Sequence, residues 1–103
     1  MTGNEYQKLT RLTRFSEDKE KMLINGAMGL CGETGEVVDI IKKYLFHNKP
    51  LLGADDLMLE LGDVLWYIAE IADVFGYNFD TLFEKNIEKL KKRYPNGFPE
   101  KNI

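Results

Sequence analysis

The fold is decided by the stretch Glu33-Thr34-Gly35-Glu36, which places two acids three residues apart. A second pair, Glu60 and Asp63, has the same spacing. On an α-helix each pair presents both carboxyl groups on one face, roughly 60° apart around the axis. The same faces carry apolar residues such as Ile40 and Ile71. The four acids are therefore predicted on the faces through which two helices pack.

Carboxylates on a packing face lose water, which costs several kcal/mol unless a positive partner compensates. No lysine or arginine stands three or four residues from any of these acids. Oxygen ligands suit Mg²⁺, with Mn²⁺ as the alternative, better than Zn²⁺, which favours His and Cys. The sequence thus predicts a divalent metal site whose ligands are Glu33, Glu36, Glu60 and Asp63. The alternative is that one or two of the acids simply reach solvent at the edge of the packed face.

The spacing of apolar residues predicts four helices and no strand. They are expected over residues 4–14, from a cap at Ser16 to about residue 48, from residue 54 or 55 to 75, and from a cap at Asn78 or Asp80 to Tyr94. The fold class is therefore all-α, as an antiparallel four-helix bundle. The acid pairs lie about equally far from the hinge near residue 49, so a rise of about 1.5 Å per residue brings them to one level.

Four glycines interrupt the second predicted helix, at positions 26, 29, 32 and 35. Each costs about 1 kcal/mol relative to alanine inside a helix. We expect that they allow another backbone, or a ligand with its metal, to approach closely. The alternative is a break into two shorter helices near Gly29.

The 103 residues predict a single domain, 1–103, with a flexible tail over residues 97–103. A net charge of −3 gives no electrostatic case for a polynucleotide partner. No apolar run reaches the roughly 18 residues of a membrane span, and residues 1–16 lack the core of a signal peptide. We therefore expect a cytoplasmic protein without a membrane partner. The lone Cys31 has no intrachain disulfide partner and is predicted to be buried.

Basic residues follow one face of the fourth predicted helix. Lys85, Lys89 and Lys92 lie at positions i, i+4 and i+7, and Asn86 and Arg93 lie on the adjoining face. A carboxylate-held Mg²⁺ commonly works on phosphates, so this face is predicted to bind a polyphosphate. A solvated surface is the alternative.

Three stretches together resemble a known family. They are GLCGETGEVVD (residues 29–39), ELGDV (residues 60–64) and KKRYP (residues 91–95), with Asn25 ahead of the first. This pattern is similar to the MazG-like group of all-α nucleoside triphosphate pyrophosphohydrolases. Many members have a second glutamate where this chain has Gly32, which leaves the number of metal ions open.

The resemblance implies Mg²⁺-dependent hydrolysis of an NTP or dNTP to a monophosphate and pyrophosphate by a homodimer or homotetramer. It implies that the four acids hold the metal and that Glu33 and Glu36 also act in catalysis. Asp39 would orient the acids. The implied substrate-binding residues are Asn25, Tyr67, Lys85, Asn86, Lys89 and Arg93. The alternatives are a phosphoribosyl-ATP pyrophosphohydrolase, a non-catalytic helical interaction module and a structural bundle held by metal.

Overall fold

The computed structural model describes residues 1–50 and 54–97. The helices are α1 (Gly3–Thr10), η1 (Arg11–Thr13, a 3₁₀ turn), α2 (Lys19–Phe46), α3 (Asp55–Val74) and α4 (Phe79–Arg93). The described ranges contain no strand, and an isolated bridge between Pro95 and Gly97 closes the turn expected there. The all-α prediction is confirmed. The end of the predicted hinge, residues 51–53, and nearly all of the predicted tail lie outside the described residues.

The predicted start of α2 needs correction. Asp18 is the N-cap, because its side chain accepts a hydrogen bond from the backbone N–H of Lys21 at 3.2 Å. Ser16 instead accepts from the backbone N–H of Asp18 at 3.1 Å, which shapes the turn before the helix. The first helix is also shorter than predicted, since it ends at Thr10 and tightens into η1.

The other predicted ends agree with the structure. Asn78 caps α4 by accepting a hydrogen bond from the backbone N–H of Thr81 at 2.9 Å. Gly76 follows α3 with a φ of +72°, a left-handed conformation that glycine adopts without steric cost. The chain therefore reverses between α3 and α4 within a few residues.

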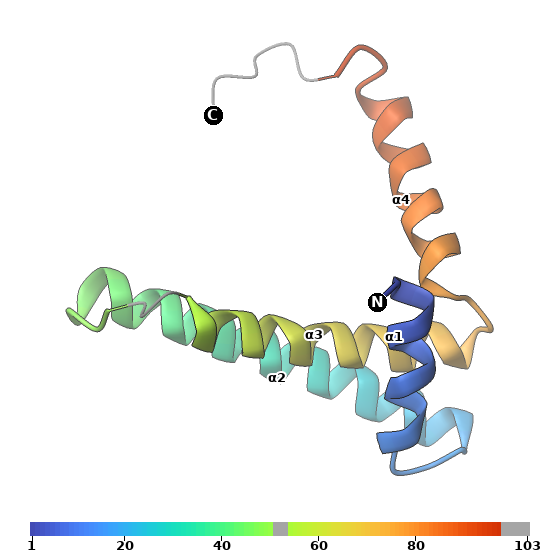
Figure 1. Ribbon diagram of the computed structural model, residues 1–103, viewed down its shortest axis with the longest axis horizontal. Coiled ribbons are helices and arrows are strands. Elements are labelled where there is room, and N and C mark those ends of the chain that lie inside the picture. The colour runs from blue at the N-terminus through green and yellow to red at the C-terminus, as the bar shows by residue number, and fades with distance from the viewer. Residues whose placement is uncertain (51–53, 98–103) are drawn as a thin grey trace.

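Helices α2 and α3 form an antiparallel hairpin, seen from cyan to yellow in Figure 1. Helix α2 is continuous, so the predicted alternative of a break near Gly29 is wrong. A Cβ atom at Gly26 would lie 2.6 Å from Cγ1 of Ile71. By contrast, Cβ atoms at Gly32 and Gly35 would meet nothing within 4 Å. Close approach is thus required at Gly26 and Gly29, and not at the other two glycines.

The N-terminal segment is tied to the end of α3 and the start of α4. The buried Gln7 donates to Asp73 Oδ1 at 2.7 Å, and its own Oε1 accepts from the backbone N–H of Phe79 at 2.9 Å. Arg11 and Arg14 both pair with the same Asp73 carboxylate, whose side chain is 6% exposed. This network holds residues 3–14 against the hairpin.

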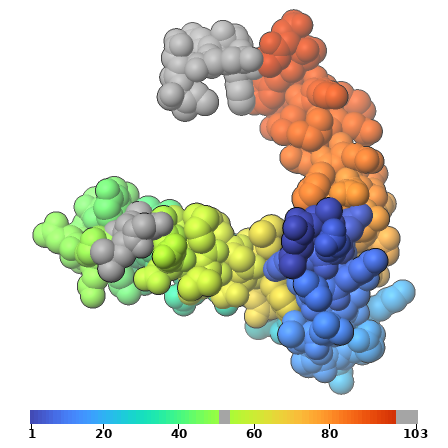
Figure 2. Space-filling model, viewed as in Figure 1, coloured from blue at the N-terminus to red at the C-terminus, as the bar shows by residue number. Residues whose placement is uncertain are grey.

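Helix α4 leaves the hairpin after its first turns. Phe79 is buried and its ring stacks on Tyr6 with centroids 5.9 Å apart. Beyond Phe83 the apolar face is uncovered, and Ile87 is 50% exposed. Figures 1 and 2 show α4 extending away from the hairpin with open space between them. The single chain therefore forms an antiparallel helix pair with a projecting arm, and it does not close a four-helix bundle.

Much apolar surface is uncovered in one chain. The buried apolar residues among those described are Met22, Ala69, Ala72 and Phe79. Outer faces of the hairpin expose Met28, Val38 and Leu65 among others, and Cys31 is exposed rather than buried as predicted. The radius of gyration is 16.5 Å, against about 13 Å for a compact chain of this length. None of the described helices is long and apolar enough to cross a membrane.

Candidate metal centre

Three of the four predicted acids meet between α2 and α3. Glu33, Glu60 and Asp63 can each place a carboxylate oxygen within 4.8 Å of those of the other two. Glu33 comes from α2, while Glu60 and Asp63 stand one turn apart on α3. Glu33 and Glu60 are half-buried and Asp63 is exposed. The count of residues from the hinge predicted this level to within about a turn, although it placed Glu36 rather than Glu33 nearest to Glu60 and Asp63.

Glu36 is not part of this group of three. It lies one turn after Glu33 and is exposed to solvent. Its negative charge nevertheless contributes to the electrostatics of Glu33. Glu36 as a ligand therefore stays a prediction.

Negative charge is concentrated at the cluster. The pKa of Glu33 is raised above its ordinary value, first because its carboxyl group shares a hydrogen bond with Glu60. Loss of water and the charges of Asp63, Glu60 and Glu36 raise this pKa further. In the described part of the chain, no lysine or arginine is among the groups that shift this pKa. A cation bound here would therefore relieve an existing repulsion.

The donor set fits a hard divalent cation. All three groups offer carboxylate oxygen, and the described part of the chain places no histidine or cysteine in the cluster. Ligand oxygens around an octahedral Mg²⁺ at about 2.1 Å lie roughly 3–4 Å apart. The observed spread of up to 4.8 Å is close to this range.

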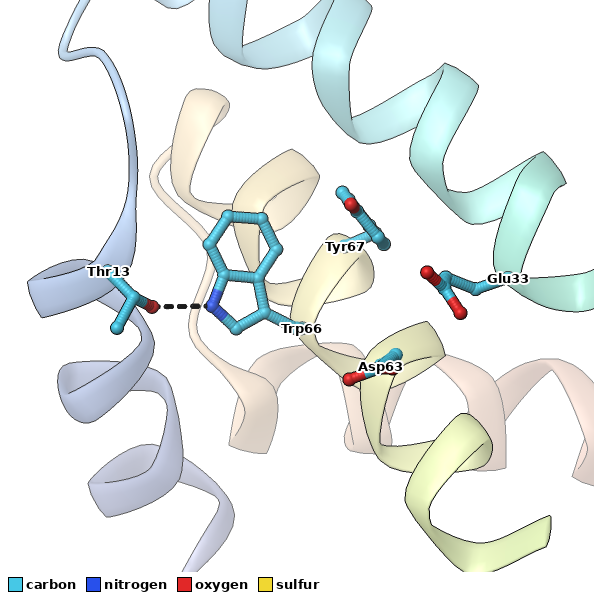
Figure 3. Close-up of a pocket in the computed structure, with 5 residues that line it drawn as sticks. All are labelled: Thr13, Glu33, Asp63, Trp66 and Tyr67. Atoms are coloured by element: carbon cyan, nitrogen blue, oxygen red, sulfur yellow. Dashed lines mark hydrogen bonds between the residues drawn. The ribbon is translucent and has the colours of Figure 1, made fainter. Parts of the chain in front are cut away.

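A pocket of about 350 Å³ opens beside the acids. It is lined by Thr13, Glu33, Asp63, Trp66 and Tyr67, as Figure 3 shows. The rings of Trp66 and Tyr67 meet edge to face, with centroids 5.1 Å apart. The pocket thus combines carboxylates on one side with an aromatic surface on the other.

The remaining predicted substrate residues lie apart from this pocket, with the exception of Tyr67. Lys85, Lys89 and Arg93 line a separate hollow of about 660 Å³ on α4, together with Lys92 and Glu88. Asn86 is exposed on the same helix and is not among the lining residues. The single chain therefore does not bring the predicted phosphate-binding face to the acids.

Asn25 and Asp39 are engaged with other side chains. The amide of Asn25 donates to Glu70 Oε1 at 2.8 Å. Asp39 pairs with Lys43 at 2.7 Å and with Lys42 at 3.9 Å, and the hydrogen bond from Lys43 lowers the pKa of Asp39. Their predicted roles in binding substrate and orienting the acids stay predictions.

A comparison with protein families gives a match over residues 25–98 to the MazG nucleotide pyrophosphohydrolase domain. The chain belongs to this family. The MazG match contains the three clustered acids, Tyr67 and the whole of α3 and α4. It confirms the family that the sequence motifs indicated.

One curated relative of the chain is the "Gene 37 protein" of Mycobacterium phage L5. It is 38% identical over 73 residues, which make up 68% of this chain and 64% of that protein. The chain thus spans less than two thirds of the length of this relative, whose name states no activity. No solved structure was found to match the chain.

Two residues at the site lie before the MazG match and were not predicted. Tyr6 donates its hydroxyl to the backbone carbonyl of Gly62 at 3.3 Å, and burial, followed by the charge of Asp63, raises its pKa. Thr13 lines the pocket and accepts a hydrogen bond from Trp66. Sequence reasoning missed both because each contact joins residues more than 50 positions apart, so no local motif marks it.

Proposed function

We propose that this MazG domain is a Mg²⁺-dependent nucleoside triphosphate pyrophosphohydrolase. It would convert an NTP or dNTP and water to a nucleoside monophosphate and pyrophosphate. The observation that carries the proposal is the meeting of Glu33, Glu60 and Asp63 within 4.8 Å, beside an aromatic pocket, in a chain of this family.

The three clustered acids would hold the Mg²⁺. When bound, the cation neutralises phosphate charge and lowers the pKa of a coordinated water. Water attacks the α-phosphorus, the bond from that phosphorus to the bridging oxygen breaks, and pyrophosphate leaves. Glu36, which is exposed one turn from Glu33, would orient the water and accept its proton. Glu33 would ligate as a carboxylate, and the hydrogen bond with Glu60 that raises its pKa opposes ionisation, so cation binding should strengthen as pH rises.

The working form is proposed to be a homodimer or homotetramer. Exposed apolar residues on the outer faces of α2 and α3 and along α4 provide surface for a second copy. The same assembly would bring the basic face of α4 toward acids of another subunit. Lys85, Lys89 and Arg93 would then bind the outer phosphates, which the carboxylate side of the pocket cannot attract.

The test is product analysis with the full chain. A panel of canonical and modified NTPs and dNTPs is incubated with Mg²⁺, and pyrophosphate, orthophosphate and monophosphate are quantified. We expect equal amounts of pyrophosphate and monophosphate from at least one substrate. Glu60→Gln should lower the rate by about 100-fold or more, since one metal ligand is lost.

The matched control is Glu20→Gln, which removes an exposed acid from the first turn of α2, far along the helix from the cluster. It should keep the wild-type rate. Release of orthophosphate in place of pyrophosphate would contradict the proposal. So would the absence of product from every nucleotide, which would leave a non-catalytic helical module.

A further inference from the structure

The pocket beside the acids is closed on one side by a segment that the family match does not include. Thr13 belongs to η1, ahead of the matched residues 25–98. Arg11 and Arg14, on either side of it, are fixed to the Asp73 carboxylate of α3. Thr13 is therefore a fixed wall of the pocket, supplied by this chain's own N-terminal segment.

The hydroxyl of Thr13 has a defined hydrogen-bonding state. It donates its proton to the backbone carbonyl of Thr10 at 3.0 Å and accepts from Trp66 Nε1 at 2.8 Å. A hydroxyl has one proton and two lone pairs, so one lone pair is left and no proton is left. Toward a ligand, Thr13 can act only as an acceptor.

The indole of Trp66 is held by the same bond. Figure 3 shows the indole between Thr13 on one side and Tyr67 with the two carboxylates on the other. A pocket of about 350 Å³ is near the lower end of the range of about 300–1,000 Å³ for small-molecule sites. It therefore suits one heterocyclic ring against an aromatic wall, with the charged part of the ligand directed to the acids.

We propose that the nucleobase of the substrate packs against Trp66 in this pocket, and that Thr13 selects bases carrying an exocyclic amino group. An amino N–H donates to the free lone pair of Thr13, whereas an oxo group at the same position places a lone pair against it. The inference rests on the proposed function and adds to it a preference for cytosine over uracil, or for adenine over hypoxanthine.

Binding is measured by tryptophan fluorescence, because Trp66 is the single tryptophan of the chain. The full chain with Mg²⁺ is titrated with triphosphate analogues that have a methylene group between the α and β phosphorus atoms. The probes are the cytidine and uridine pair and the adenosine and inosine pair, with inorganic tripolyphosphate as the ligand without a base. We expect the nucleotides to quench Trp66, tripolyphosphate to leave its emission unchanged, and the amino base to bind about tenfold more tightly in at least one pair.

Three variants assign the preference to the hydroxyl. Thr13→Val keeps the size of the side chain but removes the hydroxyl. In this variant the amino and oxo bases should bind with about equal affinity. Thr13→Ser keeps the hydroxyl and should retain it. Thr81→Val changes a threonine on α4 that does not line the pocket, and should behave as the wild type.

Equal binding of amino and oxo bases to the wild-type chain would overturn the inference, as would a preference that survives Thr13→Val or an absence of quenching by every nucleotide. Product analysis judges the proposed function separately. Pyrophosphate release without a Thr13-dependent preference would refute only the inference, and a Thr13-dependent preference without pyrophosphate release would refute only the hydrolase.

Discussion

The phenol ring of Tyr67 occupies the space that a side chain at Gly29 would need. A Cβ atom at position 29 would lie 2.1 Å from Cε1 of that ring. Gly29 stands one turn before Glu33, and Tyr67 one turn after Asp63. The close approach of α2 and α3 at this level therefore sets the distance between the helices just beside the acids.

Gly29→Ala should separate the helices at this level. We expect it to lower the free energy of unfolding by about 1–3 kcal/mol, even though alanine is the better helix former. Gly32→Ala is the matched control, because a Cβ atom at position 32 would meet nothing within 4 Å. This substitution should raise the free energy of unfolding by about 0.5–1 kcal/mol. Urea denaturation of both variants makes the comparison, and an equal gain from the two would contradict this packing.

The raised pKa of Glu33 predicts how the metal-free chain responds to pH. Between the ordinary pKa of the unfolded chain and the raised pKa of the folded chain, the native state binds more protons than the unfolded state. The free energy of unfolding must therefore fall as pH rises through this window. The physical cause is first that protonated Glu33 shares a hydrogen bond with Glu60, and then that ionised Glu33 loses water and is repelled by Asp63, Glu60 and Glu36.

Thermal unfolding in the presence of a chelator measures this effect across a pH series. Glu33→Gln isolates the contribution, because other carboxyl groups titrate in both proteins. The wild type should lose stability relative to the variant as pH rises, and Mg²⁺ should restore it. The prediction would be contradicted if the stability of the wild type relative to Glu33→Gln stayed constant or increased as pH rises.

Glu70 is a buried acid, and no lysine or arginine among residues 1–50 and 54–97 forms an ion pair with it. It is 3% exposed, one oxygen accepts from Asn25, and the other has no hydrogen-bond partner among the described residues. Glu70→Gln keeps an acceptor for Asn25 and removes the charge, so we expect a gain of about 1–3 kcal/mol in the free energy of unfolding. Glu70→Ala should instead lose stability, since it leaves the Asn25 amide unpaired. Chemical denaturation that ranks the two variants in the opposite order would contradict this view.

Asp73 is predicted to be the main attachment of the N-terminal segment. Asp73→Asn removes the buried carboxylate from Arg14, which is 11% exposed and then keeps the exposed Glu17 as its charge partner, and should cost about 3 kcal/mol. Asp80→Asn is the control, because the side chain of Asp80 accepts an exposed hydrogen bond from Asn4. This substitution should cost less than about 1 kcal/mol. Hydrogen exchange should show faster opening of residues 3–14 in Asp73→Asn alone. Similar exchange in both variants would place the attachment elsewhere.

The local sequence pattern predicted the helices of the α2–α3 hairpin and the approximate level at which their acids meet. Apolar spacing, Pro50 and Gly76 marked the helices, and the count of residues from the hinge placed the two acid pairs at one level to within about a turn. These features depend on interactions within a few turns, which a sequence displays directly.

Contacts between distant segments were not predictable in this way. Nothing near Thr13 signals that its hydroxyl accepts from Trp66, and no motif shows that α4 extends away from the hairpin. The direction of α4 depends on a few contacts around Phe79 with α1 rather than on the helix itself. The N-cap of α2 was also not predictable, because Ser16 and Asp18 are both suitable capping residues and lie only two positions apart.

The central claim is that Glu33, Glu60 and Asp63 form a divalent cation site, and a Mn²⁺ titration followed by electron paramagnetic resonance tests it most directly. The wild-type chain should bind Mn²⁺, Mg²⁺ should compete for the same site, and Glu60→Gln and Asp63→Asn should each weaken binding by about tenfold or more. Glu20→Gln, which removes an acid outside the cluster, should bind as the wild type does. Unchanged Mn²⁺ affinity in both Glu60→Gln and Asp63→Asn would contradict the claim.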